Sequence, residues 1–221
     1  ESGGEADHVR EAAAHYGLPF ASERVTVSPT GPDGKALSPE EAAREARYRA
    51  LERRMQDTGA DRVAQGHQAD DRVETLFMRL CGGAGPQALA ASLPPVRGPF
   101  IRPLINVWRR EILEYLPILP LPPLQDPSNS DLSLSRNRIR HVVLPFLARE
   151  INPKVKESLL RLLVLMEGEW GAKAGMKGES EDGREDYRRA LSLEDDSGSP
   201  SLYLDIYLRL NIQKRRDLMH S

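Results

Sequence analysis

The sequence predicts an α/β fold built on a parallel sheet, followed by helical segments. Helix-like and strand-like hydrophobic patterns alternate through the first half of the chain with short connections, as they do in βαβ units. Prolines then interrupt the chain repeatedly between residues 94 and 127, and helical patterns follow. The 221 residues, 39% of them hydrophobic and 5% aromatic, suffice for one large domain or for one domain with part of a second.

The composition excludes several classes of protein. The chain has 31 Lys and Arg against 33 Asp and Glu, a net charge of −2, so its surface as a whole is not basic. The single cysteine, Cys81, excludes an internal disulfide framework and any CxxC metal or iron–sulfur motif within the chain. No apolar run approaches the roughly 18 residues of a membrane span, and the first residues do not resemble a signal peptide. We therefore expect a cytoplasmic protein without a membrane partner.

The first half is predicted to contain three helices and two strands in alternation. The first helix covers 5–16, and the first strand covers 20–27, where polar and apolar residues alternate. After a loop, Ser38 is the N-cap of a second helix that runs to about residue 55. The second strand covers 62–66. Asp70 or Asp71 then caps a third helix that ends near residue 80.

The second half contains turns, connectors and shorter helices. A glycine-rich turn at 82–86 precedes a short helix at 107–116, and the five prolines that follow predict an extended connector up to residue 127. Two further helices are predicted near 136–147 and 153–166. Eight acidic residues against three arginines between residues 178 and 196 predict a flexible acidic linker, before an apolar pattern near the end of the chain.

A cluster of polar residues lies where the second predicted strand is followed by the third helix. His67, Asp70, Asp71 and Glu74 fall within eight positions. Ligands of parallel α/β sheets bind beyond the carboxyl ends of the strands, and helix N-termini attract anionic groups. These four residues are therefore candidate catalytic residues. The alternative is structural, with the acids as helix caps and the histidine as a hydrogen-bonded residue.

A second cluster combines an acidic, hydroxyl-rich segment at 126–131 with the basic residues after it. Residues 133–161 include seven Lys or Arg and only two Glu. Positions 136, 138 and 140 cannot share one helix face, so their arginines point in more than one direction, which suits binding to a polyanion. The alternative is a solvated helix face that pairs with the preceding acids. The candidate substrate- or RNA-binding residues are Arg136, Asn137, Arg138 and Arg140.

Taken in order, these pieces resemble the tRNA(Ile)-lysidine synthetases of the PP-loop ATP pyrophosphatase superfamily. The most specific parts are the H-x-x-D-D-x-x-E-T block at 67–75 and the D-x-S-N…R-N-x-I-R-H block at 126–141. Further matching stretches lie at 1–19, 43–51, 101–104 and 108–115. The resemblance implies a partial PP-loop (adenine nucleotide alpha hydrolase-like) domain over 1–127, with a helical extension at 128–167. An acidic linker at 168–200 and the start of a second helical domain at 201–221 would follow.

The resemblance also implies a reaction. ATP, with Mg²⁺, adenylates the C2 oxygen of the wobble cytidine in a tRNA(Ile) with a CAU anticodon, and free L-lysine then displaces AMP. His67 and Asp71 are carried over as active-site residues, with Asp70 and Glu74 in support. Arg138, with the neighbouring arginines, would contact tRNA phosphate or help close the lysine and adenylate site. Such enzymes are cytoplasmic, and the resemblance allows a homodimer.

One departure from the family is the absence of its phosphate loop, S-G-G-x-D-S. The Ser2-Gly3-Gly4 run does not replace this loop, because acidic residues follow it and no strand precedes it. We expect that N-terminal residues are missing, that the chain alone is catalytically inactive, and that neither the ATP loop nor a metal ligand can be assigned. Two alternatives are a truncated tRNA-binding module without catalysis and another PP-loop tRNA-modifying enzyme. Sulfur-inserting enzymes of the second kind typically need paired cysteines.

Overall fold

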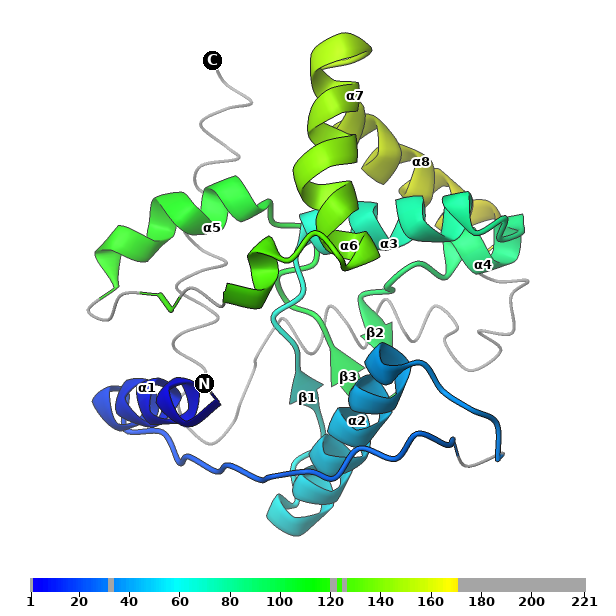
Figure 1. Ribbon diagram of the computed structural model, residues 1–221. Helices are drawn as coiled ribbons and strands as arrows, with labels where there is room; N and C mark the ends of the chain where they lie inside the picture. Colours follow the sequence, from blue (N-terminus) through cyan, green and yellow to red (C-terminus); the bar gives the residue numbers. More distant parts are fainter. Residues whose placement is uncertain (1, 32–33, 120–122, 125–126, 171–221) are drawn as a thin grey trace.

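A small three-stranded sheet lies at the centre of the computed structural model, which describes residues 2–31, 34–119, 123–124 and 127–170 (Figure 1). The strand order is β1 (Val63–Ala64), β3 (Phe100–Ile101), β2 (Val96–Arg97). β1 and β3 are parallel, as the predicted fold class requires, although β1 was expected to pair with a strand at 20–27 and β3 was not predicted; β2 pairs antiparallel with β3 through a hairpin turn. The hairpin was not predicted, because two-residue strands are too short to show a period.

The helix α2 (Pro39–Thr58) packs on this sheet (Figure 1). Its start follows the predicted capping pattern, because the Ser38 hydroxyl accepts the Glu41 N–H at 3.3 Å and Glu41 Oε2 accepts the Ser38 N–H at 3.0 Å. Gly59, with a φ of 67°, ends the helix in the left-handed conformation that glycine adopts freely. The ring of Tyr48 lies 4.6 Å from that of Phe100, which anchors the helix to β3.

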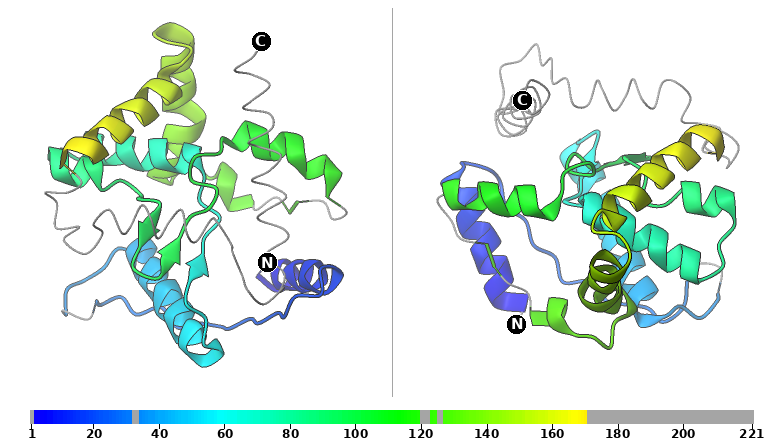
Figure 2. Two further views of the ribbon diagram at one scale, coloured as in Figure 1. Left: turned by 180° about the vertical axis from the view of Figure 1, so that it is seen from behind. Right: turned by 90° about the horizontal axis from the view of Figure 1, so that it is seen from above.

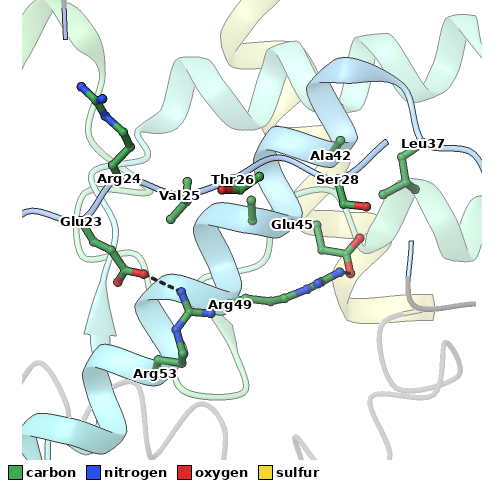
Figure 3. A pocket seen from close by; sticks show the side chains of 11 residues that line it. Glu23, Arg24, Val25, Thr26, Ser28, Leu37, Ala42, Glu45, Arg49 and Arg53 are labelled. Carbon is green, nitrogen blue, oxygen red and sulfur yellow. Dashed lines mark hydrogen bonds and ion pairs between the residues drawn. The ribbon is translucent and has the colours of Figure 1, made fainter. Parts of the chain in front are cut away.

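The predicted strand at 20–27 is wrong. This segment follows α1 (Ser2–His15) and is extended, but it joins no ladder with the described strands and crosses the surface of α2 instead (Figures 1 and 3). Arg53 Nη2 donates to Glu23 Oε1 at 2.7 Å, and the segment and helix enclose a pocket of about 290 Å³. Alternating polarity predicts an extended chain, whereas a strand also needs a neighbouring edge with which to pair. The candidate site residues do not line this pocket.

A third helix, α3 (Ala69–Cys81), begins beyond the carboxyl end of β1, and short elements follow it. These are α4 (Pro86–Ala90), α5 (Arg109–Tyr115) and the 3₁₀ turns η1 (Leu116–Ile118) and η2 (Pro127–Ser130). The helix predicted near 136–147 is present as a continuous run of α6 (Ser135–Arg138), the π-helical segment η3 (Ile139–Val143) and α7 (Leu144–Glu150).

The last described helix is α8 (Val155–Trp170), which packs against α3, α4 and α7 (Figures 1 and 2). It continues beyond residue 168, where the sequence analysis placed the start of the acidic linker. The remainder of that predicted linker and the predicted second helical domain at 201–221 lie outside the described residues.

Two apolar clusters hold these helices together. The first joins α3, α4 and α8 through Leu76, Leu89 and Leu163, and the second joins α3 to the η3–α7 run through Val73, Ile139 and Leu144. Leu159 of α8 packs against both clusters. The start of α3 is therefore fixed from two sides by buried side chains. In the part of the chain that the structure describes, no helix has the length and apolar character needed to cross a membrane.

Candidate functional site

The site is built at the first turn of α3, where the chain leaves the sheet. The Gln65 N–H donates to the Ile101 carbonyl and the Ala69 N–H to the Val107 carbonyl, each at 2.9 Å, so the connection is fixed at both ends. The N-cap residue is Gln68, which corrects the prediction that Asp70 or Asp71 would occupy this position. Asp71 still acts at the cap, because its Oδ2 accepts the Gln68 N–H at 2.8 Å.

Two carboxylates of α3 meet two guanidinium groups from the α6–η3 run. Glu74 accepts from Arg136 Nε at 2.7 Å and from Arg140 Nε at 2.6 Å, with a further contact to Arg140 Nη2 at 2.9 Å. Asp71 Oδ1 accepts from Arg136 Nη2 at 2.8 Å and from Arg140 Nη2 at 3.3 Å. The Glu74 side chain is 2% exposed, whereas the two arginines are 29% and 19% exposed. The four charges neutralise one another and join two sequence blocks that lie more than sixty residues apart.

The arginines at 136, 138 and 140 point in more than one direction, as predicted. Arg138 is exposed and donates to Ser135 Oγ at 3.1 Å, outside the network of carboxylates. Asn137 is buried, and its amide donates to the Asp131 carbonyl at 2.9 Å, which ties the preceding loop to the helix. Arg136 and Arg140 thus lie at the site, whereas Arg138 faces solvent beside it.

A pocket of about 570 Å³ opens in front of this network. Three guanidinium groups of its lining, those of Arg44, Arg47 and Arg109, form no ion pair within the described residues. Unpaired arginines that surround a cavity favour an anionic ligand. The sequence analysis did not single out these three, although Arg44 and Arg47 lie in one matching stretch and Arg109 in another. The lining residues are Ala43, Arg44, Arg47, His67, Gln68, Asp71, Arg109, Asn129, Arg136, Asn137 and Arg140.

His67 is held neutral at the edge of this pocket. Burial, together with the positive charges of Arg102, Arg136 and Arg44, lowers its pKa from 6.5 to about 4. Its Nδ1 is buried and has no hydrogen-bond partner among the described residues. A neutral imidazole at this place can donate or accept a hydrogen bond toward a ligand without adding a charge.

Asp70 does not line the pocket. Its Oδ1 accepts from Lys156 Nζ of α8 at 2.8 Å, and its Oδ2 accepts the Arg109 backbone N–H at 2.8 Å. Arg72, two positions further along α3, is buried and pairs with Glu167 of α8. The polar cluster that the sequence predicts is therefore divided, with His67 and Asp71 at the pocket, Glu74 beneath it, and Asp70 on the side of α8.

The described residues contain no group of three or more His, Cys, Asp or Glu side chains arranged to hold a metal ion. Both oxygens of Asp71 are already engaged by Gln68 and the arginines. To bind a Mg²⁺ ion, which takes one or two carboxylates together with phosphates and water, Asp71 would first have to release one of these partners.

The chain is similar in sequence to proteins of known name. The tRNA(Ile)-lysidine synthase of Geobacter sulfurreducens is 41% identical over 159 residues, which cover 72% of this chain and 33% of that protein. The enzyme of the same name from Thermobifida fusca is 40% identical over 144 residues, which cover 65% of this chain and 43% of that protein. The chain therefore spans between a third and a half of the length of these relatives.

A structural comparison shows the same fold. The U34-tRNA thiolase NcsA of Methanococcus maripaludis, solved with its [4Fe-4S] cluster, superposes with a TM-score of 0.55 and 22% identity. The superposition covers 73% of this chain and 55% of the thiolase chain. The PP-loop domain family matches residues 1–147, which include the α3 carboxylates and both arginines of the network. The chain belongs to the PP-loop domain family.

Proposed function

We propose that the chain is the PP-loop part of a tRNA(Ile)-lysidine synthase, a cytoplasmic ligase. The substrates would be ATP, free L-lysine and a tRNA(Ile) with a CAU anticodon. In the first step the C2 oxygen of the wobble cytidine attacks the α-phosphorus of ATP and pyrophosphate leaves. In the second, the amino group of lysine attacks C2, AMP leaves and the amine loses a proton. The similarity to relatives of that name over residues matched at about 40% identity supports the proposal.

The observation that carries the proposal is the meeting of the two sequence blocks at one pocket. Asp71, Arg136 and Arg140 line the pocket together, although they lie in different blocks. Arg44, Arg47 and Arg109, which form no ion pair within the described residues, add a positive charge to the pocket lining that suits the phosphates of ATP or of tRNA. The pocket thus offers a carboxylate for an ammonium group and guanidinium groups for phosphates.

The proposed roles follow from these positions. His67, being neutral, would donate a hydrogen bond to the transferring phosphoryl group. Asp71 would receive the lysine ammonium after one guanidinium leaves it, and the 3.3 Å contact to Arg140 is the longer of its two. Glu74 would keep both arginines in place from below, since it is buried and contacts each of them. The Mg²⁺ that the resemblance implies has no ready ligand set among the described residues, so no step is assigned to it.

The test is a chimera in which residues 1–170 of this chain replace the matching part of the Geobacter sulfurreducens relative. Incorporation of labelled lysine into a CAU-anticodon tRNA(Ile) transcript is the readout, and we expect it to depend on ATP. The same chimera with Asp71→Asn is the matched negative control. Binding of the tRNA without lysine incorporation would contradict the proposal and favour a tRNA-binding module. For the 221-residue chain alone we expect no ATP–pyrophosphate exchange, and sedimentation of the chain tests for a homodimer.

A further inference from the structure

The helix α8 begins after the matched PP-loop residues, yet it contacts the first turn of α3 through charged groups. Asp70, 8% exposed, directs one oxygen to Lys156 Nζ and the other to the Arg109 N–H, each at 2.8 Å. Neither oxygen is left for a ligand in the pocket. A buried carboxylate that is satisfied on both sides connects structural elements, in this case α3, α5 and α8.

We propose that Lys156 is a positioning residue of the site, which holds Asp70 and thereby fixes both the first turn of α3 and the start of α5. The first turn of α3 carries Asp71, and the start of α5 carries Arg109, and both of these side chains line the pocket. This inference rests on the proposed function in one respect, because it takes the pocket to be the site that this function uses.

The helix that carries Lys156 is itself held firmly. Leu163 is fully buried and Met166 nearly so, and both pack against Leu76 of α3. Glu167, near the end of α8, pairs with Arg72 of α3. Lys156 therefore extends from a helix whose position is set by packing along its whole length, which a positioning role requires.

The carboxylate of Asp70 is stabilised by groups from three neighbouring elements, α8, α5 and η3. Burial by itself would raise the pKa of Asp70, but hydrogen bonds from Lys156 and the Arg109 N–H, with the charges of Lys156 and Arg140, hold that pKa below its ordinary value. Without Lys156 the same carboxyl would retain its burial and lose a partner and a full positive charge. It would then take up a proton at a higher pH, and the contact between α8 and α3 would weaken.

The experiment compares Lys156→Met and Lys156→Arg in the 221-residue chain. Lys154→Met is the matched control, because it removes the same charge from an exposed residue whose side chain has no described partner. The first readouts are the titration midpoint of the Asp70 carboxyl carbon by NMR and the hydrogen exchange of the Arg109 amide. We expect Lys156→Met to raise the midpoint by about one pH unit and to speed the exchange about tenfold, and Lys156→Arg to restore both.

The second readout is the binding of inorganic pyrophosphate to the pocket as a function of pH. We expect Lys156→Met to weaken it about fivefold and to move its acidic limit to higher pH, while Lys154→Met changes neither. If Lys156→Met matched the wild type in the Asp70 midpoint and the Arg109 exchange, or if Lys154→Met had the same effects, the proposal would be overturned. A wild-type chain that bound no pyrophosphate would count against the phosphate-binding role given to the pocket arginines, and the NMR readouts would still decide the role of Lys156.

Discussion

Charged residues surround the start of α3 on two sides, and the two sides differ in what they face. On the pocket side, Asp71 and Glu74 meet Arg136 and Arg140, and all but Glu74 keep some contact with solvent. On the α8 side, the carboxylate of Asp70 and the guanidinium of Arg72 are buried and bind groups from other helices. Side chains adjacent in the sequence therefore serve different purposes, one set at the ligand pocket and the other in holding the helix.

This difference shows how a PP-loop site keeps its geometry while the charges at the pocket stay available to a ligand. The pairs that Asp71 forms with the two arginines are partly exposed at the pocket, where a guanidinium can exchange this carboxylate for a phosphate at lower cost than in a buried pair. The α8-side pairs are buried, and to separate them would leave a charge without water or partner. We expect substitutions on the pocket side to change chemistry, and those on the α8 side and in the buried Glu74 to change stability.

The largest expected effect is that of Asp71→Asn on lysidine formation. The substitution keeps the size of the side chain but removes the charge that would hold the lysine ammonium, so we expect a loss of about 100-fold or more in rate. tRNA affinity should remain largely intact. Lysine incorporation and filter binding by the chimera measure the two quantities, and Asp57→Asn, at an exposed position without a described partner, is the control. Normal turnover of Asp71→Asn would show that the active site is elsewhere.

The next largest effect is that of Glu74→Gln on stability. Glu74 is 1% exposed and contacts two arginines, and loss of its charge leaves both partly buried arginines with Asp71 as their one carboxylate partner among the described residues. We expect the free energy of unfolding to fall by about 3 kcal/mol, as measured by urea denaturation. The exposed Glu52→Gln should change it by less than about 0.5 kcal/mol. Equal effects of the two variants would mean that the network does not stabilise the fold.

A third prediction tests the buried pair on the α8 side. Glu167→Met leaves Arg72, itself 1% exposed, with Asn106 Oδ1 at 3.4 Å as its only side-chain partner among the described residues, and should cost about 2 kcal/mol. Arg72→Met combined with Glu167→Met should cost less than the sum of the two single changes, because no charge is then left unpaired. Denaturation of the four proteins measures the coupling. Additive effects would indicate that the two residues act independently.

The sequence predicted the pocket side better than the α8 side. His67, Asp71 and the arginines at 136 and 140 were found because they stand in two motifs with a recognisable spacing. The roles of Asp70 and Arg72 depend on Lys156 and Glu167, which are more than eighty residues away and belong to no motif. A single sequence gives the period of a helix, but it does not tell which distant helix packs on a given face.

Because a single sequence does not show which distant elements meet, some elements of the fold were predicted wrongly or missed. The capping pattern at Ser38 is local, and the structure confirms it. The strand expected at 20–27 needs a partner from elsewhere in the chain, and the pattern of its side chains says nothing about that partner. The two-residue strands β2 and β3 exist only because they pair with each other and because β3 also pairs with β1, so their own sequences carry little signal.

A pH experiment tests whether His67 belongs to the pocket side. Its folded pKa of about 4 lies below the ordinary 6.5, so the unfolded chain binds a proton that the folded chain does not. The stability due to the neutral ring is fully present above about pH 6.5 and is lost as the pH falls towards 4. Between pH 7.5 and 5 the wild type should lose about 1 kcal/mol more than His67→Gln, with allowance for partial solvent exposure. Parallel curves for the two proteins would contradict the lowered pKa.

The smallest effect on the fold is expected for Arg138→Ala, and this variant separates binding of tRNA from assembly of the site. Arg138 is exposed, and its side chain bonds only to Ser135 Oγ among the described residues, so its loss should change the free energy of unfolding by less than about 0.5 kcal/mol. If it contacts a tRNA phosphate, tRNA affinity should fall a few-fold and the slope of log affinity against log salt should decrease by about one. Arg136→Ala, in contrast, should lower both stability and affinity, because Arg136 contacts Glu74 and Asp71. An Arg138→Ala protein with unchanged affinity and salt slope would restrict the phosphate-binding surface to the arginines that line the pocket.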